Sequence, residues 1–242
     1  MIIKNPVTET INIGELSLKV LIERTKRKKT ISLQVKDNKL TIKAPKAVSK
    51  KELDELIHRK KSWITERAII SSEEQTVRNR EFIDNEKFYL RGKTYRLSLI
   101  EGVEEMVKIA GSLLVVTFID YKPLDRKEIK KLLEGWYLSE SIKVLKTRTN
   151  ELAKKMKVQP CGITVKNYIS KWGSCTAHNK ISYNWRIIMA PDYIIDYLII
   201  HELSHILEPN HSKDFWHHVA KYCDGFQIKR KWLRENGHRL VL

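Results

Sequence analysis

The stretch His201-Glu202-Leu203-Ser204-His205 stands inside a strongly apolar part of the chain and decides how the rest is interpreted. Residues four apart lie one above the other on a helix, so the imidazoles of His201 and His205 can reach a single metal ion. Glu202 points to the same side, where its carboxylate can serve as the base for a metal-bound water. Buried polar groups need a partner, and a metal ion provides one. This stretch therefore predicts a helix that carries a metal site.

The two ends of this helix are marked by prolines. Pro191 suits the first turn, and Asp192 complements the positive end of the helix dipole. Pro209 ends the helix, because the residue before a proline is disfavoured in the α conformation. We therefore expect a helix between these prolines and a turn directly after it.

A third metal ligand is expected just after that turn. The first candidate is His211, and Asp214 is the nearest alternative. Zinc sites that perform chemistry typically have three protein ligands and one open position for water. The spacing therefore predicts a Zn2+ site in which Glu202 is the general base and the ligands are His201, His205 and His211.

Length, hydropathy and cysteine usage describe an ordinary soluble protein. The 242 residues suffice for one large domain or two small ones. No apolar run approaches the roughly 20 residues that span a bilayer, and the first residues lack a secretion signal, so we expect no membrane partner. Three widely spaced cysteines, Cys161, Cys175 and Cys223, indicate reduced thiols. These features predict a cytoplasmic protein and carry no information on its oligomeric state.

The chain is strongly basic. Its net charge is +17, from 46 Lys and Arg against 29 Asp and Glu, and such a field attracts polyanions. The densest basic run is RTKRKK at residues 24–29, which is either a solvated face or a patch that contacts phosphates. No helix-turn-helix, zinc-finger or RNA-binding signature accompanies it. Polyanion binding through this basic surface is thus an expectation that rests on charge alone.

Hydrophobic patterns divide the chain at residues 120–123. The first part, residues 1–120, is rich in predicted strands and contains one helix that begins after Ser49. The second part, residues 121–242, begins with one or two helices up to about residue 157 and ends with the metal helix and the residues after it. Asp37-Asn38-Lys39 predicts a turn. The predicted strands cover residues 16–24, 30–35, 40–44, 87–90, 94–100, 107–109, 113–119, 163–166, 172–175 and 181–187. The fold class is therefore α+β.

Aromatic and polar residues gather in the strands that directly precede the metal helix. They occur in KWGSC at residues 171–175 and in YNWR at residues 183–186. A strand beside a metal helix can pair with an extended peptide by strand addition, whereas core packing and turn chemistry explain the tryptophans and the glycine equally well. A nearby cation can also stabilise an oxyanion. The candidate substrate-binding residues are Lys171, Trp172, Asn184 and Arg186.

The order of the motifs resembles the YgjP-like zinc metallopeptidases, relatives of the SprT-type and other zincins. The resemblance covers nearly the whole chain and is carried by residues 26–64, FYLRGKTYRLSL (88–99), KWGSC, ISYNWRIIMAP (181–191), HELSHILEPNHSKDFW (201–216) and KRKWLRENG (229–237). The spacing from His205 to His211 equals that of metzincins, but Glu208 replaces their glycine and no Met-turn follows. The resemblance implies a zincin-like α+β catalytic domain, with the three histidines on zinc and Glu202 as base.

Three functions agree with these features. The leading one is a zinc-dependent hydrolase that cleaves a peptide or protein substrate by metal-activated water. The first alternative is a nucleoside-triphosphate pyrophosphohydrolase with the same metal site, because basic side chains and a metal suit phosphoanhydride chemistry. The second is a nucleic-acid-binding protein with a structural zinc. Glu202 argues against the last function, since a closed structural site needs no base.

Overall fold

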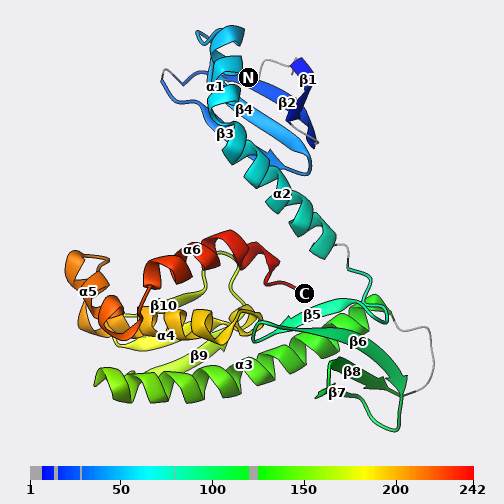
Figure 1. The fold of residues 1–242 in the computed structure, drawn as a ribbon, viewed down its shortest axis with the longest axis vertical. Coiled ribbons are helices and arrows are strands. Elements are labelled where there is room, and N and C mark those ends of the chain that lie inside the picture. The colour runs from blue at the N-terminus through cyan, green and yellow to red at the C-terminus, as the bar shows by residue number, and fades with distance from the viewer. Residues whose placement is uncertain (1–6, 14–15, 28, 79, 120–124) are drawn as a thin grey trace. The chain divides into compact units, whose positions relative to one another are not determined.

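The computed structural model describes residues 7–13, 16–27, 29–78, 80–119 and 125–242. Strands predominate early in the chain and helices late, so the predicted α+β class is confirmed (Figure 1). The contacts group into two compact units, Met1–Asn79 and Arg80–Leu242. The domain boundary expected at residues 120–123 lies outside the described residues, and the two units divide after Asn79 instead. The strands between residues 87 and 118 therefore belong to the same unit as the helix that carries His201 and His205.

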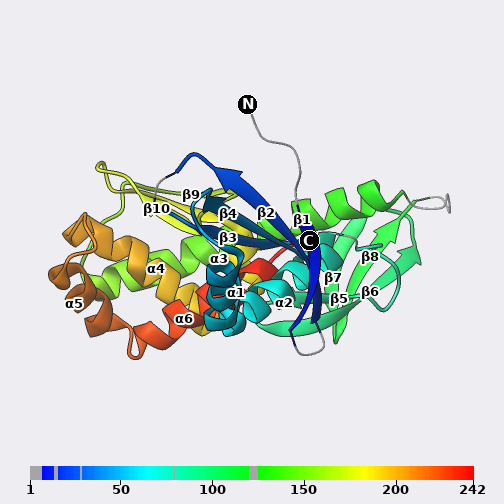
Figure 2. The same cartoon turned by 90° about the horizontal axis from the view of Figure 1, so that it is seen from above.

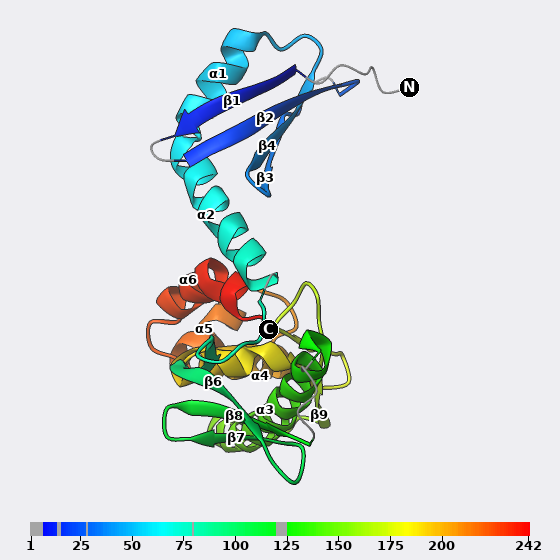
Figure 3. The ribbon, with the colours of Figure 1, turned by 90° about the vertical axis from the view of Figure 1, so that its right-hand side faces the viewer.

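The first unit is a four-stranded sheet followed by two helices. Its strands are β1 (Val7–Ile13), β2 (Leu16–Thr25), β3 (Ser32–Lys36) and β4 (Lys39–Pro45), in the order β1-β2-β4-β3. β2 and β4 are parallel, and the other neighbouring pairs are antiparallel (Figure 3). α1 (Lys50–Arg59) and α2 (Lys61–Arg78) follow. The single helix expected after Ser49 is thus two helices, because Lys60 between them leaves the helical conformation, with φ −100° and ψ 11°.

Local sequence explains the boundaries in this unit. Ser49 and Glu52 form a capping box: the Ser49 side chain accepts from the Glu52 N–H at 3.2 Å, and the Glu52 carboxylate accepts from the Ser49 N–H at 2.7 Å. Asp37 and Asn38 have positive φ, which their short side chains tolerate, so the predicted turn between β3 and β4 is confirmed. The core of the unit comprises Leu18, Val20, Leu40, Ile42, Ala44, Leu53, Ile64 and Ala68.

The second unit contains two further sheets. The first is formed by β5 (Lys87–Leu90), β6 (Lys93–Glu101), β7 (Met106–Ala110) and β8 (Leu113–Phe118), in the order β5-β6-β8-β7. One long helix, α3 (Arg126–Met156), follows where the sequence allowed one or two. β9 (Gly162–Lys166), β10 (Gly173–Cys175) and β11 (Lys180–Asn184) form the other sheet, which has β10 at one edge.

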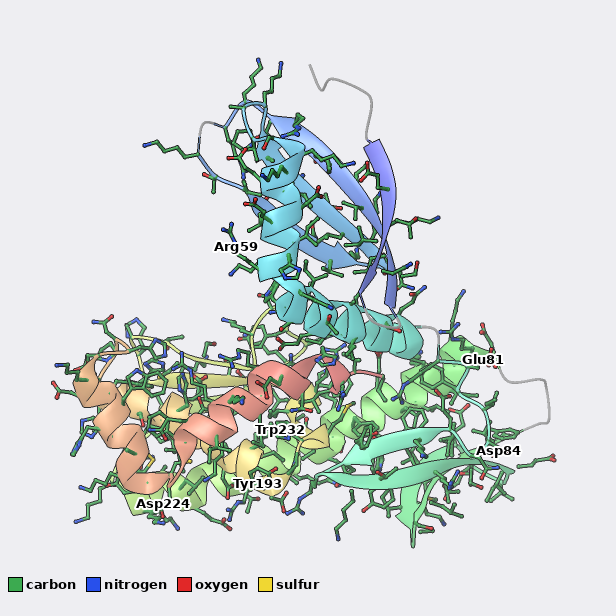
Figure 4. All side chains as sticks on the ribbon, turned by 45° about the horizontal axis from the view of Figure 1, so that its top comes forward. Arg59, Glu81, Asp84, Tyr193, Asp224 and Trp232 are labelled. Atoms are coloured by element: carbon green, nitrogen blue, oxygen red, sulfur yellow. The ribbon has the colours of Figure 1, made fainter. Side chains whose placement is uncertain are left out.

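The strand expected over residues 181–187 is shorter than predicted. β11 ends at Asn184, and the 3₁₀ helix η1 (Trp185–Met189) follows. The Asn184 side chain explains the change, because its Oδ1 accepts from the Arg186 N–H at 3.2 Å and caps the new turn. The chain then forms α4 (Asp192–Leu207), α5 (Lys213–Tyr222), α6 (Phe226–Asn236) and the 3₁₀ helix η2 (Gly237–Arg239). Asp224 lies in the turn between α5 and α6 (Figure 4).

The turn between β5 and β6 packs on the start of α4. Gly92 has φ +75°, and a Cβ added to it would lie 2.9 Å from the Cα of Pro191, so only glycine fits there. The Arg91 N–H donates to the carbonyl of Ile188 at 2.7 Å, and its guanidinium donates to both carboxylate oxygens of Asp192 at 2.7 and 2.8 Å. These contacts join residues about a hundred positions apart, which is why the β5–β8 sheet shares a unit with α4.

α4 is the centre of the second unit. It contacts α3, α5, α6 and β10 (Figures 1 and 2). A helix that is apolar on all sides is a buried one, and this agrees with its buried residues: Ile194, Ile195, Tyr197, Leu198, Ile199, Ile200, Glu202, Leu203 and Ser204. Among the described residues, no helix combines the length and apolarity that crossing a membrane requires.

Candidate metal centre

Three histidines converge at the C-terminal end of α4. His201 and His205 lie on α4, and His211 follows the turn that ends it. The Nε2 atoms of His201 and His211 are 3.1 Å apart, and one ring nitrogen from each of the three residues lies within 4.8 Å of the others. Asp214, the alternative third ligand, lies in the first turn of α5 and is not part of this group. The sequence-predicted histidines are therefore brought together.

The position of His211 follows from the end of α4 and the start of α5. Glu208 is the C-cap of α4 and has an extended backbone, φ −141° and ψ 108°, as expected before Pro209. Ser212 caps α5, because its hydroxyl accepts from the Phe215 N–H at 3.2 Å. Only two residues separate Glu208 from His211, and Ser212 follows His211 directly. The chain is thus turned back toward α4 at His211.

Two aromatic residues of α5 surround the histidines. The ring of Phe215 is fully buried, and its centroid lies 4.9, 4.5 and 4.7 Å from those of His201, His205 and His211. The ring of Trp216 stacks on His211 at 5.6 Å. The sequence pattern did not identify either residue as part of the site, although they lie four and five positions after His211 in the motif itself.

Trp216 is in turn supported by α6. It stacks on Phe226 with centroids 5.2 Å apart and an interplanar angle of 10°, and the guanidinium of Arg230 lies 4.6 Å from its ring. The cation and the aromatic ring attract each other. The exposed His211 therefore stacks on a tryptophan that is held from a second helix.

Burial and the neighbouring histidines favour the neutral form of the two imidazoles on α4. Burial lowers the pKa of His201 to about 3, with a further contribution from His205 and His211. Burial also lowers the pKa of His205. Its Nδ1 lies 3.3 Å from the carbonyl oxygen of Glu208, and a proton on Nδ1 leaves the Nε2 lone pair free. Neutral imidazole is the form that binds a metal, so these residues fit the three-histidine set that zinc takes in catalytic sites.

Glu202 is buried beside the histidines. Its side chain is only 4% exposed, and burial raises the pKa of its carboxyl to about 8, while the positive charge of Lys171 opposes this rise. The backbone of Gly173 on β10 lies directly against its side chain. A buried carboxyl with a raised pKa in a cluster of metal-binding side chains is typical of a proton-transfer group.

The four candidate substrate-binding residues have different surroundings. Lys171 is close enough to Glu202 to affect its pKa, and its ammonium lies 4.5 Å from the Tyr168 ring. The ring of Trp172 packs on Gly237, where an added Cβ would lie 2.9 Å from its Cζ2. Lys171 thus lies near Glu202, whereas the Trp172 ring contacts Gly237, and the part of both residues in substrate binding stays a prediction.

Asn184 and Arg186 are placed differently from the expectation. Asn184 is buried, and its side-chain amide donates to the carbonyls of Tyr168 at 3.0 Å and Lys171 at 3.3 Å. It therefore holds the loop before β10. The Arg186 guanidinium donates to the side chain of Asn167 and lies 4.5 Å from the Trp185 ring. The described contacts of both residues run to that loop and to Trp185.

Comparison with known proteins gives a clear family match. The family model described as "YgjP-like, metallopeptidase domain" matches residues 29–236. The crystal structure of the metallopeptidase zymogen of Pyrococcus abyssi abylysin is similar over 40% of this chain and 99% of that one, with 15% identity and a TM-score of 0.37. That of Methanocaldococcus jannaschii jannalysin is similar over 36% and 93%, with 22% identity and a TM-score of 0.32. A search of curated proteins found no match.

Proposed function

The chain belongs to the YgjP-like metallopeptidase family, and we propose that it is a zinc-dependent peptidase with Glu202 as general base and with His201, His205 and His211 as the metal ligands. The observation that carries this proposal is the convergence of three histidine nitrogens, two from α4 and one from the turn after it, next to the buried Glu202 of α4. When bound, the metal would act as a Lewis acid that lowers the pKa of a water and polarises the scissile carbonyl.

Each histidine contributes through its environment. Burial and low basicity keep the ring of His201 neutral, and the contact of His205 Nδ1 with the Glu208 carbonyl orients that ring. Such outer contacts fix the tautomer and direction of metal-binding imidazoles. Phe215 is fully buried, and its ring packs against all three imidazoles. The triad is thus preorganised by residues that do not themselves bind the metal.

Glu202 would move the proton. Its carboxylate takes a proton from the attacking water as the oxygen bonds to the carbonyl carbon, and gives it to the amine nitrogen as the C–N bond breaks. Burial favours the protonated carboxyl, and the charge of Lys171 favours the ionised one. The two influences oppose each other, which suits a group that must both accept and release a proton near neutral pH.

The edge strand β10 would align the substrate. It is one of the two outer strands of the β10-β11-β9 sheet and lies against Glu202. An extended peptide can add to such an edge through main-chain hydrogen bonds. Lys171 precedes the strand by two positions, so a cation is available near the place where an oxyanion would form. These features support a peptide or protein substrate.

The test is hydrolysis of two substrate panels by zinc-loaded protein. We expect new amino termini from peptides or proteins, and no pyrophosphate from nucleoside triphosphates. Glu202→Gln should bind as much zinc as the wild type and lose on the order of 10²–10⁴-fold in kcat. Release of nucleoside monophosphate and pyrophosphate would favour the nucleotide-hydrolase alternative. Activity of Glu202→Gln within about twofold of wild type would remove Glu202 as the base.

A further inference from the structure

Gly173 is an unusual residue for its position. It lies in β10 and pairs with Tyr183 of β11 in antiparallel register. Glycine inside a strand weakens it, and often marks a place where another group approaches the backbone closely. Positive φ is found at Gly92, Gly111 and Gly225 but not at Gly173. Any residue can therefore adopt its backbone conformation. Glycine is required here because there is no room for a side chain.

The space beside Gly173 is filled by Glu202. A Cβ added to Gly173 would lie 2.7 Å from the Cδ and 2.8 Å from the Cγ of Glu202, and its carboxylate oxygen Oε1 would be closer still. Real Cβ atoms essentially never approach other heavy atoms within 3.0 Å. All three of these nearest atoms belong to the Glu202 side chain. A methyl group at position 173 would therefore collide with the predicted base.

The backbones on both sides of this contact are held in place. On the β10 side, the Asn184 N–H donates to the Trp172 carbonyl at 2.7 Å, and the Trp172 ring is packed on Gly237. On the α4 side, Leu203 and Ser204 are completely buried. The end of a side chain moves more easily than a packed strand or helix. The Glu202 carboxylate is thus the part that a larger residue 173 would displace.

We propose that Gly173 is a positioning residue that sets the location of the Glu202 carboxylate beside the three histidines. The absent side chain leaves the volume that the carboxylate occupies, and the β10 backbone forms the wall that confines it. This inference rests on the proposed role of Glu202 as general base. Gly173 would thus contribute to proton transfer indirectly, because it positions Glu202.

Gly173→Ala tests the proposal, with Gly162→Ala as the matched control. Gly162 lies on β9 of the same sheet, where an added Cβ would lie 3.5 Å from the Cε of Lys180, an ordinary contact. Gly173→Ala should lower kcat on the order of 10²-fold, because displacement of a reacting group by about 1 Å has that effect. KM and bound zinc should change by less than about twofold, as should every parameter of Gly162→Ala. Wild-type kcat in Gly173→Ala would overturn the proposal.

A double-mutant cycle separates a positioning role from general damage. In a Glu202→Gln background the base is already absent, so Gly173→Ala should reduce the residual kcat by less than about twofold. An equal loss in both backgrounds would show that Gly173 acts by some other route. Glu202→Gln alone reports on the proposed function. Loss of activity in that variant, together with full activity in Gly173→Ala, would reject the present inference alone.

Thermal unfolding of the metal-free proteins gives a readout that does not depend on activity. Glu202→Ala removes the atoms that the new methyl group meets, so Gly173→Ala should lower Tm less in that background than in the wild type. If Gly173→Ala does not fold and the double variant does, the contact is supported. If neither folds, or if both backgrounds show the same decrease in Tm, the contact with Glu202 is not what requires glycine.

Discussion

The two sides of the candidate metal centre are built differently. α4 sets His201, Glu202 and His205 by its helical period, within a helix that is buried on nearly all sides. His211 is exposed, follows the end of that helix, and stacks on Trp216 of the next one. The first side is determined by local sequence and the second by packing among three helices. A ligand triad can thus combine secondary structure with tertiary structure.

Removal of a ligand from either side should have the largest effect on metal binding. Structural zinc sites with four protein ligands bind with about 10–16 kcal/mol, or roughly 2.5–4 kcal/mol per ligand, so His205→Ala and His211→Ala should each weaken zinc binding on the order of 10²–10³-fold. Competition with a chromogenic chelator measures the affinity. Asp214→Ala is the control on the turn side and should remain within about twofold. A weaker affinity in Asp214→Ala with no change in His211→Ala would make Asp214 the third ligand.

Substitution of Trp216 should affect mainly the turn side, because its ring stacks on His211 at an interplanar angle of 23°, whereas it meets the His201 ring at 53° with the centroids 5.8 Å apart. Trp216→Leu removes the ring on which His211 stacks, and removal of a supporting residue typically weakens metal binding by about tenfold or more. Trp232→Leu on α6 (Figure 4) replaces another tryptophan and should leave zinc affinity unchanged. In a His211→Ala background, Trp216→Leu should have little further effect. Equal effects with and without His211 would show that Trp216 does not act through it.

Phe215 should connect the two sides, because its ring contacts all three imidazoles. Phe215→Leu should lower the free energy of unfolding of the metal-free protein by about 1–2 kcal/mol, since it removes volume from a closed core. It should also weaken zinc binding a few-fold. Phe88→Leu changes a residue that is similarly buried in the same core. That control should show a similar decrease in stability in urea unfolding and keep its zinc affinity. If Phe88→Leu weakened zinc binding as much as Phe215→Leu, the contacts of Phe215 with the imidazoles would not explain the effect.

The sequence predicts the helical side of the centre well. The two prolines at 191 and 209 and the His201–His205 spacing predicted a helix between them, and α4 covers Asp192–Leu207. The turn signals placed His211 near the pair, where its ring nitrogen lies in the structure. These features depend on residues only a few positions apart, where backbone conformation and helical period decide the outcome.

Long-range packing is what the sequence does not reveal. The contact of Gly92 with Pro191 joins β5–β6 to α4 across 99 positions, so hydrophobic patterns alone placed the boundary after that sheet and not before it. The contact of Gly173 with Glu202 is likewise invisible in a pattern, because a glycine in a strand has several explanations. Asn184 has a polar side chain of the kind that binds substrates, yet its amide donates its hydrogen bonds to the loop before β10.

The smallest effect on hydrolysis is expected from the basic run of the first unit. Lys26, Arg27 and Lys29 are exposed, whereas the Arg24 guanidinium donates to the carbonyls of Pro45, at 3.0 Å, and Val48 and belongs to the fold. Lys28 lies outside the described residues. Arg24 is also exposed, but because of these hydrogen bonds we exclude it from the charge replacement and change only Lys26, Arg27 and Lys29.

Replacement of Lys26, Arg27 and Lys29 by Gln should leave turnover of a short neutral peptide within about twofold of wild type, because a screened surface charge has little effect on a neutral substrate. Anisotropy of a labelled single-stranded oligonucleotide, followed against salt, measures polyanion binding in parallel. Any such binding should weaken. The slope of the logarithm of the binding constant against the logarithm of the salt concentration should become shallower by about 0.7 for each phosphate that is no longer neutralised. If peptide turnover collapsed while the fold and zinc content were unchanged, the basic run would belong to the active site.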